Sequence, residues 1–243
     1  ATHDRWRTKQ RRVVAGALGV VVSAITRGRR IGGLYFSGTE IRDLLVAWVA
    51  LGVAFALFFV GGAAGIGRIV AAGVVLPLVV SLVTAGSGFL FHEVAHKAVA
   101  VRYDQVAEFR ADRGMLFLAV MSALLGFIFA APGAVYHRGR VTPSEQARIA
   151  LAGPAVNAAL LVVFVPVFFV GSVLGNEIVT LVGERGVAIN VFLAAFNLIP
   201  YGPLDGRTVY RWSRLVWAIT FVPAALLTGL LVFVFGLGFS GPF

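Results

Sequence analysis

The sequence predicts an all-α polytopic membrane protein, with about five to six transmembrane helices and a re-entrant or short β element after the helix that carries His92. Of the 243 residues, 59% are hydrophobic and 13% are charged, whereas soluble globular domains carry about 25% charged residues. The mean hydropathy is +0.90. Four apolar runs reach or approach the length of about 20 residues that a helix needs to cross a bilayer. These runs are 44–60, 69–91, 155–170 and 215–239.

The first 40 residues form a basic segment that precedes an expected membrane-embedded domain at 41–243. Within this segment, the apolar stretch 13–26 has arginines on both sides. Because 14 apolar residues are too few for a full span, we expect a helix that lies in the membrane interface or inserts partly. Ser37-Gly38-Thr39-Glu40 is a capping-box pattern. It predicts the start of a first span that ends near residue 60, before a glycine-rich turn at 61–67.

The middle of the chain is predicted to contain a long, bent span followed by less regular structure. A continuous helix over 68–101 would be about 50 Å long, which is more than a bilayer requires. Either Pro77 or the Gly86-Ser87-Gly88 triplet is expected to bend it. We then expect a polar loop at 103–114, an apolar stretch at 115–131 and an extended segment at 134–137.

The second half is predicted to contain further helices. Thr142, Pro143 and Glu145 provide an N-cap, a proline at N1 and a glutamate at N3, so a helix should begin there and run to about residue 170. After it we expect, in order, a polar loop at 171–186, a short apolar helix at 187–199, a turn with three arginines at 201–214, and a last span at 215–239.

A metal-binding motif lies near the end of the second predicted span. His92-Glu93-Val94-Ala95-His96 reads H-E-x-x-H, and helical residues four apart share a face, so both imidazoles can reach one metal ion with Glu93 beside it. The alternative is that both histidines are core or interfacial residues that match the motif by chance. Ionisable side chains inside an apolar segment are costly unless they are functional, which favours the metal site. The chain contains no cysteine, so further ligands must be His, Asp or Glu.

Asp205 is a candidate for the third ligand. It follows an apolar helix and lies in a segment broken by Pro200, Gly202 and Pro203, which would let the carboxylate turn toward the histidines. An aspartate directly before a glycine is also common in turns and at helix termini. From the residues alone, both interpretations of Asp205 stay open.

Two motifs in this order resemble those of the site-2 protease family of intramembrane zinc metalloproteases. They are the H-E-x-x-H motif at 92–96 and the segment 197–206, which contains the candidate aspartate. A Gly-Pro-x-x-Asn sequence at 153–157 is also similar to that family. The resemblance covers about residues 69–214, which is the expected catalytic core. The extra apolar sequence at 115–131 departs from the short β-hairpin that many members have there.

The resemblance implies a role for each of these residues. It implies that His92, His96 and Asp205 hold one zinc ion per chain. Glu93 would then act as the general base. Asn197 is implied to lie near the site, where it would help to hold the substrate or the oxyanion.

The three ligands must lie at the same depth in the membrane, and this constrains 115–131. If that stretch crossed the membrane, Asp205 would emerge on the side opposite the histidines; if it dips in and returns, the ligands can meet. We therefore predict five full spans plus a re-entrant element, whose backbone must be covered by protein or water. On this topology the inner loops between the first and last spans carry ten Lys and Arg residues, including Lys97, whereas the outer loops carry Arg68 and Arg185.

The predicted function is hydrolysis of peptide bonds in or near transmembrane helices of membrane-protein substrates, by water that zinc and Glu93 activate. The protein is expected in the cell membrane, with its active site toward the cytoplasmic side. Segment 134–137 is either an edge strand that holds an unwound substrate or a simple loop. His137 is either a further ligand or a lone exposed loop histidine.

Other functions are compatible with some of these residues. A metal-binding membrane protein or transporter could use the same ligands, but transporters usually show internal repeats and several polar residues along a path, and neither is evident. A serine protease using Ser87 would need a later base, and no histidine follows His137. Intact Glu93 argues against an inactive relative. The net charge of +10 is assigned to loops facing the cytoplasm. The expected partners are therefore the lipid bilayer and a transmembrane substrate, and not nucleic acid.

Overall fold

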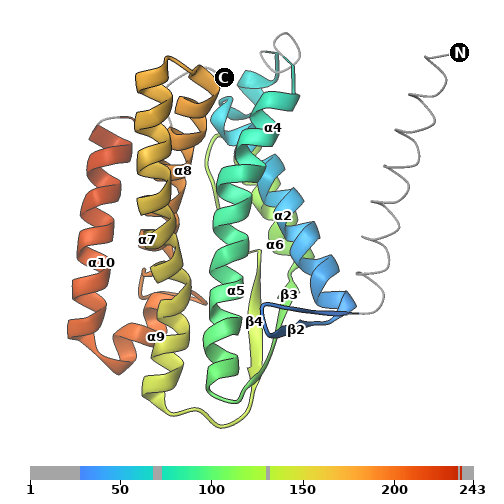
Figure 1. Cartoon of the computed structure of the whole chain (residues 1–243), viewed down its shortest axis with the longest axis vertical. Coiled ribbons are helices and arrows are strands. Elements are labelled where there is room, and N and C mark those ends of the chain that lie inside the picture. Colours follow the sequence, from blue (N-terminus) through green and yellow to red (C-terminus); the bar gives the residue numbers. More distant parts are fainter. Residues whose placement is uncertain (1–27, 68–72, 130–131, 235, 237–243) are drawn as a thin grey trace, which may run out of the picture.

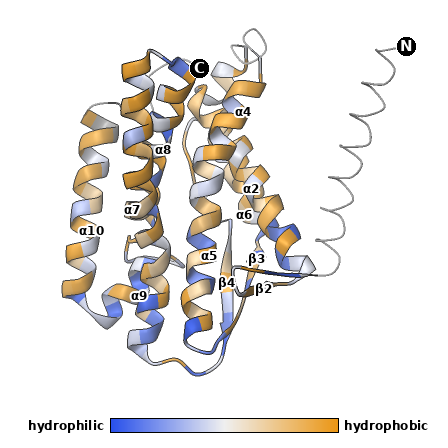
Figure 2. Ribbon diagram, in the orientation of Figure 1, coloured by the Kyte–Doolittle hydropathy of each residue, from blue (hydrophilic) through white to orange (hydrophobic). Residues whose placement is uncertain are grey.

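Five helical segments are long and apolar enough to cross a membrane, as the sequence predicts. The computed structural model describes residues 28–67, 73–129, 132–234 and 236, and the segments stand side by side along the long axis of the molecule (Figure 1). Hydrophobic residues cover them, whereas hydrophilic residues gather near α9 (Asp205–Trp212) and the lower end of α5 (Figure 2). The chain is therefore a polytopic membrane protein. The segments are Gly38–Phe59 (α2), Val75–Arg102 (α4, η2 and α5), Pro143–Leu174 (α7), Glu177–Asn197 (α8) and Arg214–Leu231 (α10 and the start of η3).

A short hairpin precedes the first span. In it, β1 (Arg29–Ile31) pairs antiparallel with β2 (Leu34–Phe36). Ser37 then caps α2, because its hydroxyl accepts the N–H of Glu40 at 3.1 Å, and this confirms the predicted helix start. The Glu40 carboxylate itself contacts the Lys97 ammonium and the main-chain N–H of Phe109. The interfacial helix predicted at 13–26 lies outside the described residues.

The second span is irregular near its glycines. After η1 (Gly62–Gly65), α4 (Val75–Ser81) passes into the π-helical segment η2 (Leu82–Gly86), and α5 (Ser87–Arg102) continues from it. Pro77 lies in the first turn of α4, and the π-helical segment ends at Gly86, the first residue of the glycine triplet. A Cβ atom on Gly86 would lie 2.6 Å from the Trp48 ring, so the absence of a side chain lets α2 pack closely there.

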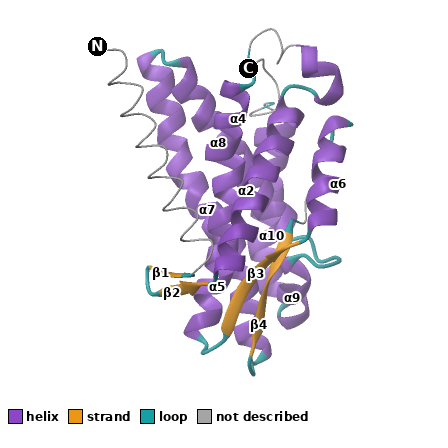
Figure 3. Ribbon diagram, turned by 90° about the vertical axis from the view of Figure 1, so that its right-hand side faces the viewer, coloured by secondary structure: helices purple, strands orange, loops and turns teal. Residues whose placement is uncertain are grey.

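The segment after α5 enters the membrane domain and returns. The predicted polar loop at 103–114 instead contains β3 (Val106–Ala111), which pairs antiparallel with β4 (Gly133–Arg138) (Figure 3). Between them, α6 (Arg113–Leu124) packs its small and apolar residues against α2. Because the two strands pair, the chain makes no net crossing here. The prediction of a re-entrant or short β element is therefore confirmed, and the segment is both.

The predicted loop at 171–186 is wrong. α7 continues to Leu174, and α8 already begins at Glu177, after a turn in which Gly175 has a φ of +63°. The polar residues that suggested a loop lie on α8, which packs tightly on α7: a Cβ atom on Gly183 would lie 2.2 Å from the Phe168 nitrogen. The expected short helix at 187–199 is the second half of this full span.

Two basic residues assigned to loops are buried in helices instead. Arg185 lies on α8 with its guanidinium 4.5 Å from the centroid of the Phe59 ring, and Lys97 lies on α5. An ion or aromatic ring inside the protein can stabilise such a charge, and hydropathy alone does not reveal this. Arg68, the other residue assigned to outer loops, lies outside the described residues.

The last part of the chain contains a short helix followed by the last span. The predicted turn at 201–214 contains the short helix α9, which begins at Asp205. α10 (Arg214–Thr228) and the π-helical η3 (Gly229–Val234) then form the last span, as expected. Trp217 on α10 donates its indole N–H to the Leu198 carbonyl at 2.8 Å, which ties α10 to the end of α8.

Candidate metal centre

Helix α5 presents both histidines of the motif to one point. The Nε2 atoms of His92 and His96 lie 3.0 Å apart, and both side chains are buried. One helical turn separates the two residues, so this convergence follows directly from the i, i+4 spacing. Glu93 is also buried, and it lines a cavity that both histidines line as well.

Asp205 completes the group from the start of α9. Its Oδ2 atom lies 3.3 Å from the Nε2 atom of each histidine. After α8 the chain reverses direction, and Gly206 lets α9 begin against the end of α8, since a Cβ atom there would lie 1.9 Å from the Leu198 oxygen. Among the described residues, His92, His96 and Asp205 are the group whose ligand atoms all lie within 4.8 Å of one another.

The electrostatics of the site suit a metal ligand. Burial alone would raise the pKa of Asp205, but the adjacent His96 and His92, through charge and hydrogen bonding, outweigh burial and lower that pKa to about 2. Asp205 is therefore a carboxylate at neutral pH, which is the form that binds a metal.

The donor atoms fit zinc. Ligand atoms bound to tetrahedral zinc at about 2.0–2.1 Å lie about 3.3–3.4 Å from one another. The three donor atoms are 3.0, 3.3 and 3.3 Å apart, which is close to the edges of such a tetrahedron. Two imidazole nitrogens and one carboxylate oxygen also form a ligand set that catalytic zinc sites use, and they leave the fourth position open.

Hydrogen bonds hold both imidazoles in the tautomer that a metal site needs. The Nδ1 atom of His92 lies 2.7 Å from the Oδ1 atom of Asn157, and the Nδ1 atom of His96 lies 2.7 Å from the carbonyl oxygen of Ile149. Both partners are acceptors, so each Nδ1 carries a proton, and Nε2 is the nitrogen that each imidazole directs toward Asp205 and can offer to a metal. The Asn157 amide is itself oriented, because its Nδ2 atom donates to Asn190 and to the Gly88 carbonyl.

Helix α7 contributes to this centre although it supplies no ligand. A Cβ atom on Gly153 would lie 2.5 Å from atoms of both imidazoles, so a glycine is needed for α7 to approach. The Gly-Pro-x-x-Asn motif, to which the sequence alone assigns no role, thus places Gly153 and Asn157 against the histidines. The Ile149 contact uses a backbone carbonyl, which leaves no trace in the residue types.

The centre opens onto a cavity of about 240 Å³. Asn197 lines this cavity and donates its Nδ2 hydrogen to the Leu193 carbonyl at 3.0 Å, so it lies near the ligands without joining them. His137 also lines the cavity, but it is outside the ligand group and belongs to β4 rather than to a loop. The edge of β4 therefore borders the metal centre.

Fold and site together define a membrane protein with a candidate metal centre of the H-E-x-x-H type, formed by a spanning helix and the short helix α9. The chain is 38% identical over 193 residues to a protein of Methanocaldococcus jannaschii named "Putative zinc metalloprotease MJ0611", and the match covers 77% of this chain and 92% of that protein. The chain therefore belongs to this family of zinc metalloproteases.

Two longer proteins that are also named putative zinc metalloproteases are similar to the chain. The sll0528 protein of Synechocystis is 33% identical over 152 residues, which cover 59% of this chain and 34% of that protein. Rip3 of Mycobacterium tuberculosis is 32% identical over 142 residues, which cover 53% of this chain and 30% of that protein. This chain thus spans about a third of the length of these two relatives. No family model matches the chain, and no solved structure does.

The hydrogen-bonding scheme predicts a graded loss of zinc affinity. Asp205→Ala removes a ligand and should weaken zinc binding by about 100-fold or more. Asn157→Leu keeps all three ligands but removes the partner of His92, together with the bonds to Asn190 and Gly88, and should weaken zinc binding by about 10-fold. Titration of the metal-free protein against a chromophoric chelator measures both. Thr208→Ala, which alters a cavity-lining residue outside the ligand group, is the control and should keep wild-type affinity. Unchanged affinity in the Asp205 variant would contradict the assignment of the third ligand.

Proposed function

We propose that this protein is an intramembrane zinc metalloprotease of the site-2 protease type, which hydrolyses peptide bonds in or near transmembrane helices of membrane-protein substrates. The observation that carries the proposal is the position of the site. His92, His96 and Asp205 converge inside a bundle of membrane-spanning helices, so a substrate must reach them from within or beside the bilayer. A conventional zinc metalloprotease that acts on soluble substrates would instead carry the site on a soluble domain.

The proposed chemistry assigns one role to each group. A zinc ion held by His92, His96 and Asp205 would supply the Lewis acid that polarises the scissile carbonyl and activates water. Glu93 accepts a proton from the attacking water and passes it to the nitrogen of the leaving amine. Asn197, at the wall of the same cavity, is proposed to hold the substrate or the oxyanion through its amide.

The free edge of β4 is the proposed binding site for the unwound substrate. The Asp112 nitrogen donates to the Pro132 oxygen at 2.9 Å, so the strand pairing is hydrogen-bonded at this position. In an antiparallel pair the bonded and non-bonded positions alternate. The N–H and C=O groups of Gly133, Val135 and His137 therefore point away from β3, and all three residues line the cavity. An extended peptide that pairs with this edge would lie against the metal centre.

The proposed orientation places the metal centre near the cytoplasmic face of the cell membrane. His96 lies six residues before the end of α5 at Arg102, which is about 9 Å of helix, so the site is below the surface and not at the midplane. The same end of the bundle carries many basic residues, as the positive-inside rule expects of cytoplasmic loops. These residues are Arg102, Arg138, Arg140, Arg148, Arg207, Arg211 and Arg214.

Replacement of the proposed base should separate metal binding from catalysis. Glu93→Gln keeps the size of the side chain but cannot accept the proton, so cleavage of a reconstituted single-span substrate should fall by about 10²- to 10⁴-fold. Zinc content should stay at the wild-type level. Glu177→Gln at the exposed start of α8 is the matched control and should cleave normally. Cleavage near the wild-type rate in the Glu93 variant would remove Glu93 from the mechanism.

A proline at the edge of β4 should impair substrate binding specifically. Val135→Pro removes an N–H group that points away from β3, so the strand pairing survives while the edge loses a donor. We expect normal zinc binding with a clear rise in KM for the transmembrane substrate. Val135→Ala, which keeps the N–H group, is the control. Equal KM values in the proline and alanine variants would exclude main-chain pairing at this position.

The absence of cysteine from the chain allows a direct test of orientation. Arg140→Cys at the site end should react with a membrane-impermeant maleimide from the cytoplasmic side. Glu177→Cys at the opposite end should react only from the other side, and both should react after the membrane is permeabilised. The reverse pattern would show that the metal centre faces away from the cytoplasm.

A further inference from the structure

A buried ion pair lies beside the metal centre without belonging to it. The Oε2 atom of Glu40, in the first turn of α2, is 2.5 Å from the Nζ atom of Lys97, which directly follows His96 on α5. Glu40 is 1% exposed and Lys97 is 2% exposed. The Lys97 ammonium also lies 4.3 Å from the centroid of the Phe36 ring. Burying two charges is costly and gives little net stability, so the pair calls for an explanation beyond stability.

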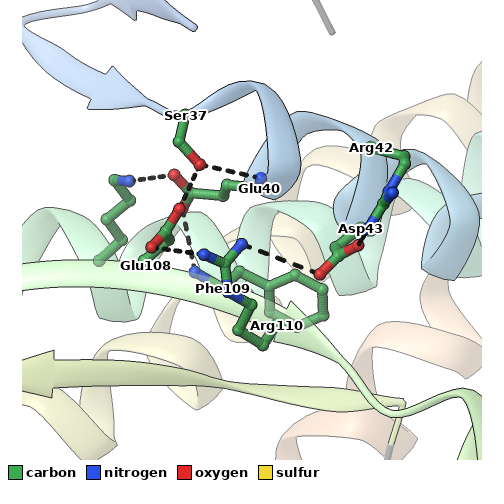
Figure 4. A network of polar contacts seen from close by, with 8 residues as sticks. Ser37, Glu40, Arg42, Asp43, Glu108, Phe109 and Arg110 are labelled. Atoms are coloured by element: carbon green, nitrogen blue, oxygen red, sulfur yellow. Dashed lines mark hydrogen bonds and ion pairs between the residues drawn. The ribbon is translucent and has the colours of Figure 1, made fainter. Parts of the chain in front are cut away.

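The second carboxylate oxygen of Glu40 holds a strand. Its Oε1 atom accepts the main-chain N–H of Phe109 at 3.0 Å (Figure 4). Phe109 is opposite Val135 in the sheet, at a position where the N–H groups point away from the partner strand. One carboxylate therefore joins the start of α2, the metal-binding helix α5 and the outer edge of β3.

The surrounding contacts strengthen the attachment of β3 to α2. Ser37 donates its hydroxyl to Glu108, and Arg110 pairs with Glu108 at 2.8 Å and with Asp43 at 4.0 Å. These ion pairs are partly exposed, so each contributes little to stability. The Phe109 ring is buried and packs edge-on against Phe89 of α5, with the ring centroids 5.7 Å apart. The strand is thus fixed through both its backbone and its side chain.

We propose that Glu40 and Lys97 form a clamp that positions the substrate-binding sheet relative to the metal centre. They are positioning residues, because neither touches the ligand group or lines the cavity. The clamp occupies the outer edge of β3 at its centre, so a peptide can add to the sheet only at β4. It also ties that sheet to the residue next to His96, which sets the distance between the edge of β4 and the metal. The proposal rests on the proposed function, since it assumes that β4 receives the substrate.

Two charge-neutral double variants separate the hydrogen bond from the ion pair. Glu40→Gln/Lys97→Met removes both charges but keeps an amide oxygen that can accept the Phe109 N–H. Glu40→Met/Lys97→Met removes both charges and also this acceptor, with a side chain of similar length. Neither variant leaves a buried charge without a partner, so both should fold. Their difference isolates the bond from Glu40 to Phe109.

We expect equal zinc affinity in the two double variants. In E40M/K97M, amide hydrogen exchange in 106–111 and 133–138 should be about 10-fold faster than in E40Q/K97M. KM for the transmembrane substrate should be about 10-fold higher in E40M/K97M than in E40Q/K97M, with kcat nearly unchanged in both. E40Q/K97M keeps the bond to β3 but loses the link to α5, so its KM should lie between those of the wild type and E40M/K97M. If exchange and KM are equal in the two variants, the pair has only a structural role and the proposal is overturned.

A measurement on the unaltered protein covers the case in which E40M/K97M does not fold. The Phe109 amide should exchange much more slowly than the Val135 amide, although both point away from the partner strand, because only Phe109 has Glu40 as an acceptor. Comparable exchange at the two positions would overturn the clamp. Exchange and zinc affinity do not depend on cleavage. Slow Phe109 exchange in a protein that cleaves no substrate would therefore refute the protease proposal and support the placement of the sheet.

Discussion

The meeting of two imidazole nitrogens with one carboxylate inside the membrane domain is the constraint on which the rest of the structure depends. His92 and His96 are neighbours on one helix, but Asp205 comes from a segment more than a hundred residues later. The chain must leave α5, cross the membrane twice through α7 and α8, and return to the same depth. This requires an even number of crossings between the ligands. The pairing of β3 with β4 satisfies it, because the segment that contains α6 makes no net crossing.

The low polarity of the surroundings explains why the centre is so completely hydrogen-bonded. A polar group buried without a partner is costly, and there is no bulk water inside a helix bundle to compensate. Each imidazole therefore uses its second nitrogen, one with Asn157 and the other with the Ile149 carbonyl. The same bonds direct the Nε2 atoms, rather than the Nδ1 atoms, toward Asp205. One set of hydrogen bonds thus gives the buried imidazoles their partners and also orients them toward the third ligand.

The two outer edges of the strand pair are covered differently. Extended backbone at membrane depth must be covered, because its N–H and C=O groups need partners. On β3 the start of α2 provides the cover, and Glu40 binds the Phe109 N–H directly. On β4 the outer edge faces the cavity that also holds the metal ligands. Under the proposed function, the peptide would add only to the open edge, at a single, defined distance from the site.

Patterns local in sequence determined the spans, the start of α2 and the pair of histidines, because hydropathy, capping and helical periodicity act over a few residues. They failed where a contact between distant segments decides the outcome. The polar run at 171–186 is helical because Gly183 packs on α7, and Lys97 is buried because Glu40 neutralises it. The choice between a turn aspartate and a ligand at Asp205, and the role of Asn157, likewise depend on how helices pack across the bundle. Only the tertiary structure brings those residues within hydrogen-bonding distance of the histidines, and no local property of the chain encodes that distance.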